Sequence, residues 1–229
     1  MSRLVLMTSP LLGSSLWAPV AATLRDRGWD VSVPVLSRFL RTPDDVVRGF
    51  LDGIPDQPDL VLVPHSNAGL YVAAVAAARS VRSVRAVVFA DAGMPAGSPT
   101  TMTAPQSFRD FIGRLPVVDG LLPPWTQWWP REDLDTLFPD TLTRESVEAD
   151  EPRLPPSYFD CVVPSPPGWD ELRAAYLAFG DTYADERSVA AARGWPVETL
   201  PGGHLHLLVD PVGTADALVR LLGRTGVVS

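Results

Sequence analysis

Short apolar runs that alternate with helical patterns constrain this chain more than any other feature. The runs lack polar alternation, and stretches with apolar residues at helical spacing separate them. Strands of this kind are buried on both faces, which is typical of parallel sheets covered by helices. The pattern predicts an α/β fold with about six mostly parallel strands. The strand candidates are 4–7, 29–36, 60–63, 84–90, 174–179 and 197–200.

The helices of the first half carry recognisable start and stop signals. Thr42 followed by Pro43, Asp44 and Asp45 predicts a helix that runs to about Gly53, because threonine caps a helix and acids favour its first turn. A helical pattern over 16–27 ends at glycine 28, a residue typical of helix C-termini. We also expect an Ala-rich helix over 68–78 and a last helix from 211 to about 222.

Residues 92–170 break the alternation. This stretch holds 14 of the 24 prolines and 4 of the 7 tryptophans, and it lacks a convincing buried strand. Helical spacing follows Pro105 and Pro130, so we expect a cap insertion built of short helices. The predicted division is a core of residues 1–91 and 171–229 with the cap at 92–170.

Composition excludes several function classes. The net charge is −8 and lysine is absent, which argues against a nucleic-acid partner and against Schiff-base or P-loop chemistry. The single Cys161 excludes a cysteine zinc site, and no dinucleotide motif is present, so no cofactor is expected. The uncharged stretch 4–24 is interrupted by Pro10 and Gly13, and no run is long enough to span a bilayer. We therefore expect a cytoplasmic protein without a membrane partner.

The segment from Val61 to Gly69, VLVPHSNAG, carries the central motif. A predicted strand runs into Ser66, small residues surround it, and a helix follows at once. This layout projects the serine hydroxyl above the sheet and aims the helix N-terminus and the Asn67 N–H at a developing oxyanion. An ordinary strand–helix turn with a serine cap would have the same local sequence.

This motif resembles the nucleophile elbow of the α/β-hydrolase superfamily, which reads G-x-S-x-G. Ala68 fills the second small position, whereas Pro64 replaces the first glycine. The segment PGGH that ends at His204 resembles the catalytic-histidine loop of the same family, in the same chain order. The resemblance implies that Ser66 and His204 meet at one edge of the sheet, with His204 as the base. His206 forms an H-x-H pair with it, but without further ligands we expect no metal.

The acid is less clearly marked. The family usually places it after the penultimate strand, where the corresponding residue is Tyr183. Asp181 and Asp185 are near, but residues 182–185 predict a helix capping box. Asp91 ends the strand that follows the elbow, at the edge where α/β sites form, and is the acid that we expect. A turn-capping role for Asp91, and a Ser-His dyad without an acid, remain alternatives.

The loop after the first strand departs from the family pattern. Thr8 and Ser9 stand where His-Gly is common, and Pro10 then occupies the position of an oxyanion donor although proline has no N–H. Losing such a donor costs about 3–4 kcal/mol of transition-state stabilisation. Three alternatives follow: Leu11 donates instead, a hydroxyl of Thr8 or Ser9 substitutes, or the reaction forms no ordinary oxyanion.

The cap contains the segment PPWTQWWP, with Trp125, Trp128 and Trp129. Their apolar area is suited either to lining a pocket for a hydrophobic small molecule or to joining short helices. We expect Trp125 and Trp128 to contribute to substrate binding.

The sequence thus favours a serine enzyme acting on an ester or thioester of a hydrophobic small molecule. A lyase, eliminase or cyclase of bacterial secondary metabolism, using the same serine and histidine as acid–base groups, is the first alternative, which Pro10 favours. A non-catalytic binder of small molecules is the second, because fold alone does not establish catalysis.

Overall fold

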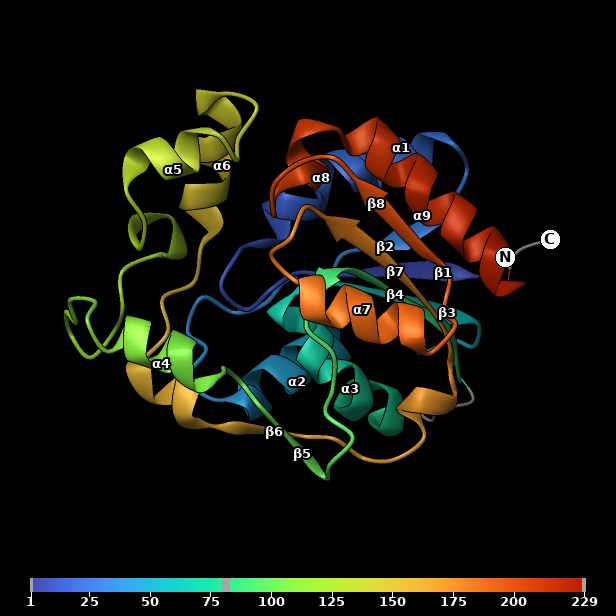
Figure 1. Ribbon diagram of the computed structural model, residues 1–229, viewed down its shortest axis with the longest axis horizontal. Coiled ribbons are helices and arrows are strands. Elements are labelled where there is room, and N and C mark those ends of the chain that lie inside the picture. The colour runs from blue at the N-terminus through green and yellow to red at the C-terminus, as the bar shows by residue number, and fades with distance from the viewer. Residues whose placement is uncertain (1, 80–82, 228–229) are drawn as a thin grey trace.

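The computed structural model describes residues 2–79 and 83–227, and within them six parallel strands form the central sheet (Figure 1). The strand order is β2-β1-β3-β4-β7-β8, and every neighbouring pair is parallel. The predicted mostly parallel sheet is therefore confirmed. The strands are β1 (Arg3–Met7), β2 (Asp30–Ser32), β3 (Leu60–Ser66), β4 (Val84–Ala92), β7 (Arg173–Phe179) and β8 (Val197–Leu200).

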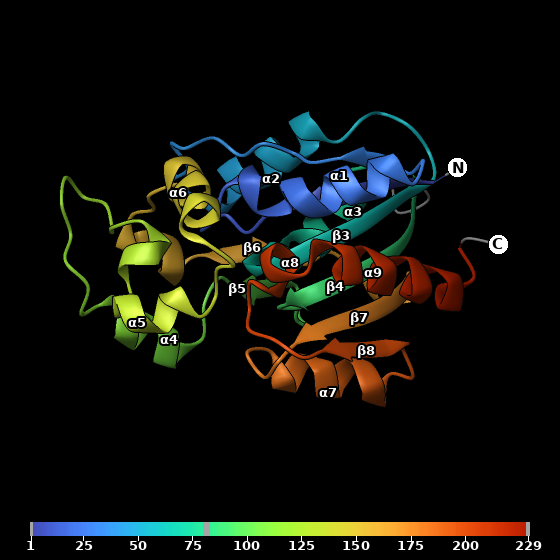
Figure 2. The same ribbon diagram turned by 90° about the horizontal axis from the view of Figure 1, so that it is seen from above.

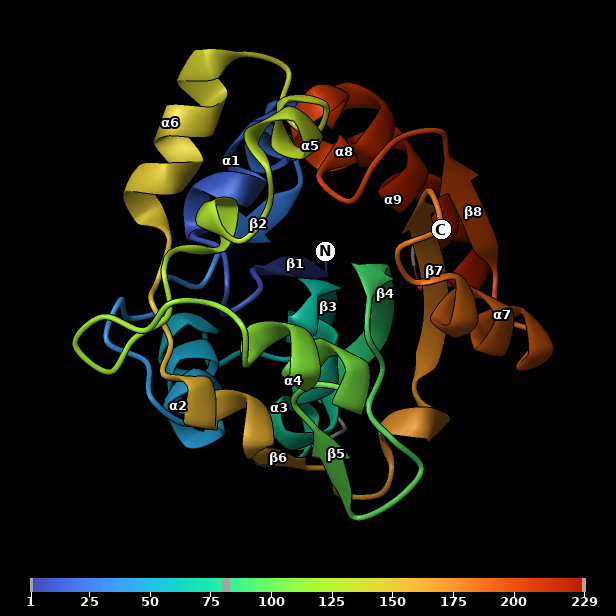
Figure 3. The same ribbon diagram turned by 60° about the vertical axis from the view of Figure 1, so that its left-hand side comes forward.

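Helices cover both faces of this sheet, with α1 and α9 on one side and α2 and α3 on the other (Figure 3). In β1, Leu4 and Leu6 pack into the apolar cluster beneath α1 and α9, while Val5 and Met7 pack into the opposite cluster beneath α2 and α3. Successive strand residues point to opposite faces, so a run without polar residues supplies both clusters at once. The core helices are α1 (Ala18–Asp26), α2 (Pro43–Gly53), α3 (Val72–Ala78), α7 (Ala184–Ala192), α8 (His206–Val209) and α9 (Pro211–Thr225).

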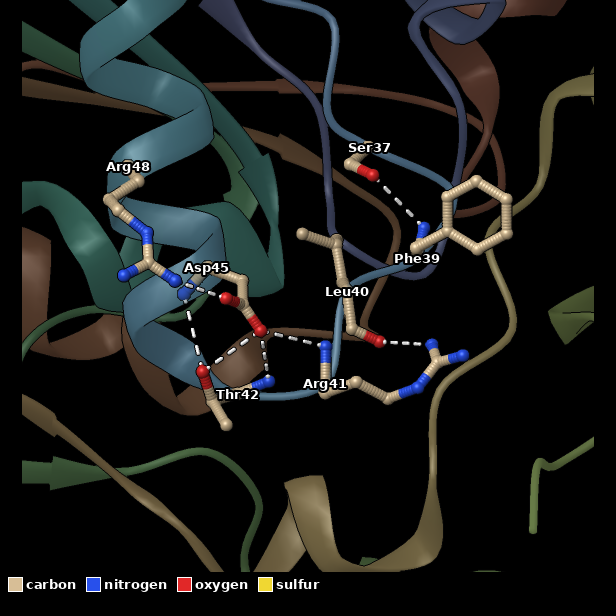
Figure 4. Close-up of polar contacts among 7 residues, drawn as sticks. All are labelled: Ser37, Phe39, Leu40, Arg41, Thr42, Asp45 and Arg48. Atoms are coloured by element: carbon tan, nitrogen blue, oxygen red, sulfur yellow. Dashed lines mark hydrogen bonds and ion pairs between the residues drawn. The ribbon is translucent and has the colours of Figure 1, made fainter.

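The start of α2 confirms the predicted capping signal (Figure 4). The Asp45 N–H donates to Thr42 Oγ1 at 3.3 Å, and the Thr42 N–H donates to Asp45 Oδ2 at 2.9 Å. Arg48 also pairs with the Asp45 carboxylate. These bonds satisfy N–H groups that have no partner within the helix.

Two expected elements are shorter in the structure. Only Asp30–Ser32 of the predicted strand 29–36 pairs with β1, and Pro34 follows soon after. The predicted helix over 16–27 opens as the 3-10 helix η1 (Ser14–Trp17), and α1 begins at Ala18 with a proline in its first turn. The Trp17 indole explains this opening, because its N–H donates to the Met7 carbonyl at 3.2 Å and holds the turn against the end of β1.

The helices α4, α5 and α6 of the predicted cap lie at the end of the molecule opposite both termini, whereas β5 and β6 lie beside the core (Figures 1 and 2). Short helices follow Pro105 and Pro130 as expected. Two three-residue strands that the sequence did not predict, β5 and β6, pair antiparallel in this region. Only the middle residue of each strand is buried, so neither is a buried strand of the kind that forms the central sheet. The elements are β5 (Thr100–Met102), α4 (Gln106–Ile112), η4 (Trp125–Gln127), α5 (Arg131–Asp135), α6 (Thr141–Asp150), η5 (Pro156–Asp160), β6 (Val162–Pro164) and η6 (Trp169–Glu171).

Across 2–79 and 83–227, no helix combines the length and the apolar character that a membrane crossing requires. The cytoplasmic location and the division into core and cap stay predictions.

Candidate active site

Ser66 ends β3 in a strained backbone conformation. Its φ is 57° and its ψ is −132°, a combination that residues with a side chain rarely adopt. The 3-10 helix η2 (Asn67–Tyr71) follows directly, so the predicted strand–turn–helix layout is present. The Gly93 N–H donates to the Ser66 carbonyl at 3.1 Å. Gly69 passes so close to Gly93 that an added Cβ would lie 1.9 Å from the Gly93 oxygen, which explains the need for a small residue there.

Asp91 and His204 meet at the carboxyl edge of the sheet. The His204 Nδ1–H donates to Asp91 Oδ2 at 2.6 Å, and the other oxygen, Oδ1, accepts the Phe179 N–H at 3.0 Å. Asp91 is fully buried and has a positive φ of 44°. Its oxygens contact Phe179 and His204, while the N–H of Gly93 is taken by Ser66, so these contacts are not those of a turn cap.

His65 supports the His204 loop from below. The two rings stack with centroids 4.5 Å apart, and His65 Nε2–H donates to the His204 carbonyl at 3.0 Å. Burial lowers the pKa of His65 well below its ordinary value, and the neighbouring His204 adds to this effect. A neutral His65 carries its proton on Nε2, since a carbonyl only accepts. His65 thus holds the backbone of residue 204 through its ring N–H.

Tyr183 is the hydrogen-bond partner of Ser66. Its hydroxyl lies 3.3 Å from Ser66 Oγ, and its ring centroid lies 5.6 Å from that of His204. Among the described residues, Ser66 Oγ has no hydrogen bond to His204. The structure thus brings the serine and the histidine to the same edge without the direct bond that the sequence predicts. In free enzymes such bonds are often long and shorten only when substrate binds.

Sequence reasoning missed this tyrosine. The sequence did contain a signal for it, because residue 183 stands at the position where the family usually has its acid, next to the histidine. Desolvation of the hydroxyl raises the pKa of Tyr183 to about 12. The charge of Asp91 also raises this pKa, whereas the hydrogen bond to Ser66 lowers it. The phenol is therefore neutral, and it can donate a hydrogen bond.

The two other carboxylates point elsewhere. Asp181 is exposed and pairs with Arg187 at 3.0 Å. The predicted capping box over 182–185 is wrong, because α7 has Tyr183 at its N-cap and no side-chain capping bond. Asp185 is exposed in the first turn of α7.

The loop after β1 offers hydroxyls in place of backbone donors. Thr8 and Ser9 are buried, and the Leu11 N–H donates to Ser9 Oγ at 3.3 Å. Leu11 is thus occupied locally, which disfavours it as the substitute for Pro10. Thr8 Oγ1 is buried and has no partner among the described residues.

Cap residues hold the side chain of Asn67. Its amide Nδ2 donates to the Thr103 carbonyl at 2.9 Å, and the Tyr158 hydroxyl donates to its Oδ1 at 3.3 Å. Thr103 Oγ1 in turn donates to the Tyr158 carbonyl at 2.8 Å, and Tyr71 bonds the Tyr158 hydroxyl. This network fixes the residue whose backbone N–H opens η2 and has no partner inside that helix.

The tryptophans join the cap elements. Trp128 is buried, its ring contacts those of Phe108 and Phe159, and its N–H donates to the Pro123 carbonyl at 2.8 Å. Trp125 is partly buried, packs against both apolar clusters of the core and contacts Trp129 edge-on. Their part in substrate binding stays a prediction.

His206 packs its ring against Phe179, with centroids 5.7 Å apart, at the start of α8. In the part of the chain that the structure describes, no group of three or more histidine, cysteine or acidic side chains is arranged to hold a metal.

The sequence matches no family model and no curated protein. Solved structures do match. An extracellular α/β-hydrolase from a Paenibacillus species, described as sharing structural and functional homology with tobacco salicylic acid binding protein 2, is 17% identical, covers 96% of this chain and 99% of its own, and has a TM-score of 0.72. A pyrethroid hydrolase is 18% identical, with 97% and 98% covered and a TM-score of 0.72. A tomato methylketone synthase I variant complexed with β-ketoheptanoate is 15% identical, with 98% of both chains covered and a TM-score of 0.68. This chain therefore has the α/β-hydrolase fold.

Proposed function

We propose that the protein is a serine hydrolase in which Ser66 is the nucleophile, His204 the base and Asp91 the acid. The 2.6 Å hydrogen bond between Asp91 and His204, at the edge where Ser66 ends β3, carries this proposal. With its Nδ1 proton engaged by a carboxylate, the neutral imidazole keeps the lone pair of Nε2 for a proton from the serine.

The reaction has two halves. Ser66 Oγ attacks the ester carbonyl, its proton passes to His204, and the C–O bond to the leaving alcohol breaks as the alcohol oxygen takes that proton. Water then attacks the acyl-serine carbonyl and gives a proton to His204. The bond between the acyl carbon and Ser66 Oγ breaks, Oγ takes that proton from His204, and the acid is released. Asp91 stabilises the imidazolium in both halves, and the Asn67 N–H donates to the oxyanion.

This proposal requires one rearrangement. Ser66 Oγ is bonded to Tyr183 in the structure, so the hydroxyl must turn toward His204 when substrate enters. A change of side-chain rotamer at Ser66 moves Oγ without moving the backbone.

An acid–base enzyme for elimination or cyclisation is the second candidate. Pro10 lacks an N–H, and the N–H of Leu11 is bonded to Ser9, so a backbone donor from this loop is missing. The similarity in fold to a methylketone synthase is consistent with this candidate. In either case we propose a hydrophobic small molecule as substrate, with Trp125 and Trp128 of the cap contributing to its site, and no cofactor.

Reaction with a fluorophosphonate probe, followed by turnover of p-nitrophenyl esters, tests the proposal. The hydrolase is expected to be labelled at Ser66 and to turn over the esters, and Ser66→Ala and His204→Ala each to abolish turnover while the circular dichroism spectrum is unchanged. Labelling with negligible turnover favours the acid–base enzyme. Absent labelling, together with unchanged ligand binding by Ser66→Ala, indicates a non-catalytic binder.

A further inference from the structure

Tyr183 contacts the nucleophile from the β7 side of the site. Its hydroxyl lies 3.3 Å from Ser66 Oγ. During the reaction the substrate's acyl carbon is bonded to Oγ, so the hydroxyl is within reach of the other oxygens on that carbon. The reaction described above assigns this phenol no task. Its position beside both Ser66 and the His204 ring needs an explanation beyond packing.

The backbone holds Tyr183 and His204 in a fixed relation. Gly180 follows β7 with a φ of +68°, and a Cβ there would lie 2.5 Å from the Gly202 oxygen, so the two loops pack backbone against backbone. Arg187 stabilises the loop after β7, because its guanidinium donates to the Gly180 carbonyl at 3.0 Å. The tyrosine hydroxyl is thus presented at the same place as the imidazole.

Strand order decides which substrate oxygen the phenol meets. β3, which carries Ser66, lies between β1 and β4, and β7 and β8 follow beyond β4. The loop after β1 therefore stands on one side of Ser66, and Tyr183 and His204 stand on the other. The base delivers its proton to the leaving group, so the leaving group lies on the side of Tyr183.

We propose that Tyr183 donates a hydrogen bond to the leaving-group oxygen of the substrate, and that the substrate is an oxygen ester of an unactivated alcohol rather than a thioester. This inference rests on the proposed serine hydrolase. When the tetrahedral intermediate collapses, the C–O bond breaks, its electron pair stays on the alcohol oxygen, and His204 supplies the proton. The phenol keeps its own proton and stabilises the negative charge that develops on that oxygen.

The substrate class follows from the strength of the acceptor. An oxygen that gains alkoxide charge accepts a strong hydrogen bond from a phenol, whereas the sulfur of a departing thiolate is a weaker acceptor and leaves more easily. A p-nitrophenolate leaves without assistance because its charge is delocalised. Only the alkyl ester therefore gains substantially from Tyr183.

The test compares three butanoyl substrates, the ethyl ester, the S-ethyl thioester and the p-nitrophenyl ester, with the wild-type protein and Tyr183→Phe. The variant is expected to lose about 10- to 100-fold in kcat/KM on the ethyl ester, the effect of one hydrogen bond to a developing charge. On the other two substrates it is expected to lose about threefold or less. Tyr71→Phe is the matched control, because it removes a buried phenol hydroxyl that is bonded to Tyr158 and not to Ser66. It is expected to keep the wild-type ratios among the three substrates.

Equal losses on all three substrates would overturn the proposal, since they would show that Tyr183 only positions Ser66 or His204. An unchanged kcat/KM on the ethyl ester, or a wild-type protein that turns over only the thioester, would also overturn it. Failure of the underlying function has a different signature, because then the wild-type protein turns over none of the three substrates, whether or not the fluorophosphonate probe labels Ser66. The fluoride of the probe leaves without assistance, so labelling of Tyr183→Phe is expected to match labelling of the wild type. Such a match confirms that the variant is folded.

Discussion

Replacing Glu151 by glutamine is expected to remove a pH-dependent loss of stability from the cap. Glu151 follows α6 and is 3% exposed. Its Oε2 accepts from the Thr126 hydroxyl at 2.8 Å and from the Thr126 N–H at 3.4 Å, while Oε1 is buried without a partner among the described residues. Burial raises the pKa of Glu151 to about 7, and the charge of Glu148 adds to this, whereas Thr126 and Arg144 oppose it.

The direction of the effect follows from the two pKa values. In the unfolded chain the carboxyl has a pKa near 4.5, so the folded protein binds this proton more tightly. The stabilisation is fully present below pH 4.5 and is lost as the pH rises through about 7. The difference between the two pKa values corresponds to about 3 kcal/mol. Glutamine keeps an acceptor for Thr126 and does not ionise, so it lacks this loss.

Urea denaturation from pH 4.5 to pH 8, followed by tryptophan fluorescence, measures the effect; the lower limit is the pKa of the unfolded carboxyl. Three of the seven tryptophans lie in the neighbouring segment 125–129, so the signal includes a large contribution from the cap. The free energy of unfolding of the wild type is expected to fall by about 3 kcal/mol relative to Glu151→Gln over this range. Groups that titrate in both proteins cancel in the difference. Glu145→Gln, at an exposed position of the preceding helix α6, is the control and should follow the wild type. Parallel profiles for wild type and Glu151→Gln would refute the reasoning, because they would mean that the carboxyl ionises in the folded protein without cost.

Three other predictions concern the site. Asp91→Asn is expected to lower kcat about 10⁴-fold, because an amide no longer fixes the histidine tautomer. The kcat of exposed Asp181→Asn is expected to remain near the wild-type value. Ester kinetics on both variants show which of the two carboxylates matters for turnover. Gly69→Ala is expected to lower the free energy of unfolding by about 3 kcal/mol or more, because the added Cβ would meet the Gly93 oxygen. Gly223→Ala, with open space around it in α9, is expected to raise that free energy by about 0.5–1 kcal/mol. Equal effects of the two variants in thermal unfolding would contradict the packing argument. Ser66→Gly is expected to raise the free energy of unfolding by about 1 kcal/mol relative to Ser66→Ala, since glycine adopts a φ of 57° without strain, and urea denaturation tests it.

Local patterns predicted what local physics determines. The apolar run 60–63, with Ser66, Ala68 and Gly69 shortly after it, indicated a buried strand and a tight turn, and the structure has both. The capping signal at Thr42 was equally reliable, because its hydrogen bonds join residues three positions apart. The capping box predicted over 182–185 is absent, although the residue types at these positions suit one. There the Tyr183 hydroxyl is engaged by Ser66, and the chain meets α7 with a φ of −120° and a ψ of 46°, so a contact across the fold decided the local conformation.

Partners that are distant in the sequence could not be assigned from patterns. The strands β5 and β6 have only three residues each and pair across some sixty positions, so neither carries a periodic signal. Tyr158 likewise reaches Asn67 from the cap, a contact that depends on how the cap folds back onto the core.

The choice among carboxylates shows why strand order was needed. β4 lies between β3 and β7, so a side chain at its end can face the loops after β3, β7 and β8 together. Asp91 does so with one oxygen on the Phe179 N–H and the other on His204. After β7, the close approach of Gly180 to Gly202 leaves no room for a side chain between the two loops, and Asp181 pairs outward with Arg187. A carboxylate at the end of β4 makes one after β7 unnecessary for orienting the imidazole. Residue 183 is thereby free to be a tyrosine, and in the proposed reaction its neutral hydroxyl is a hydrogen-bond donor, which a carboxylate is not.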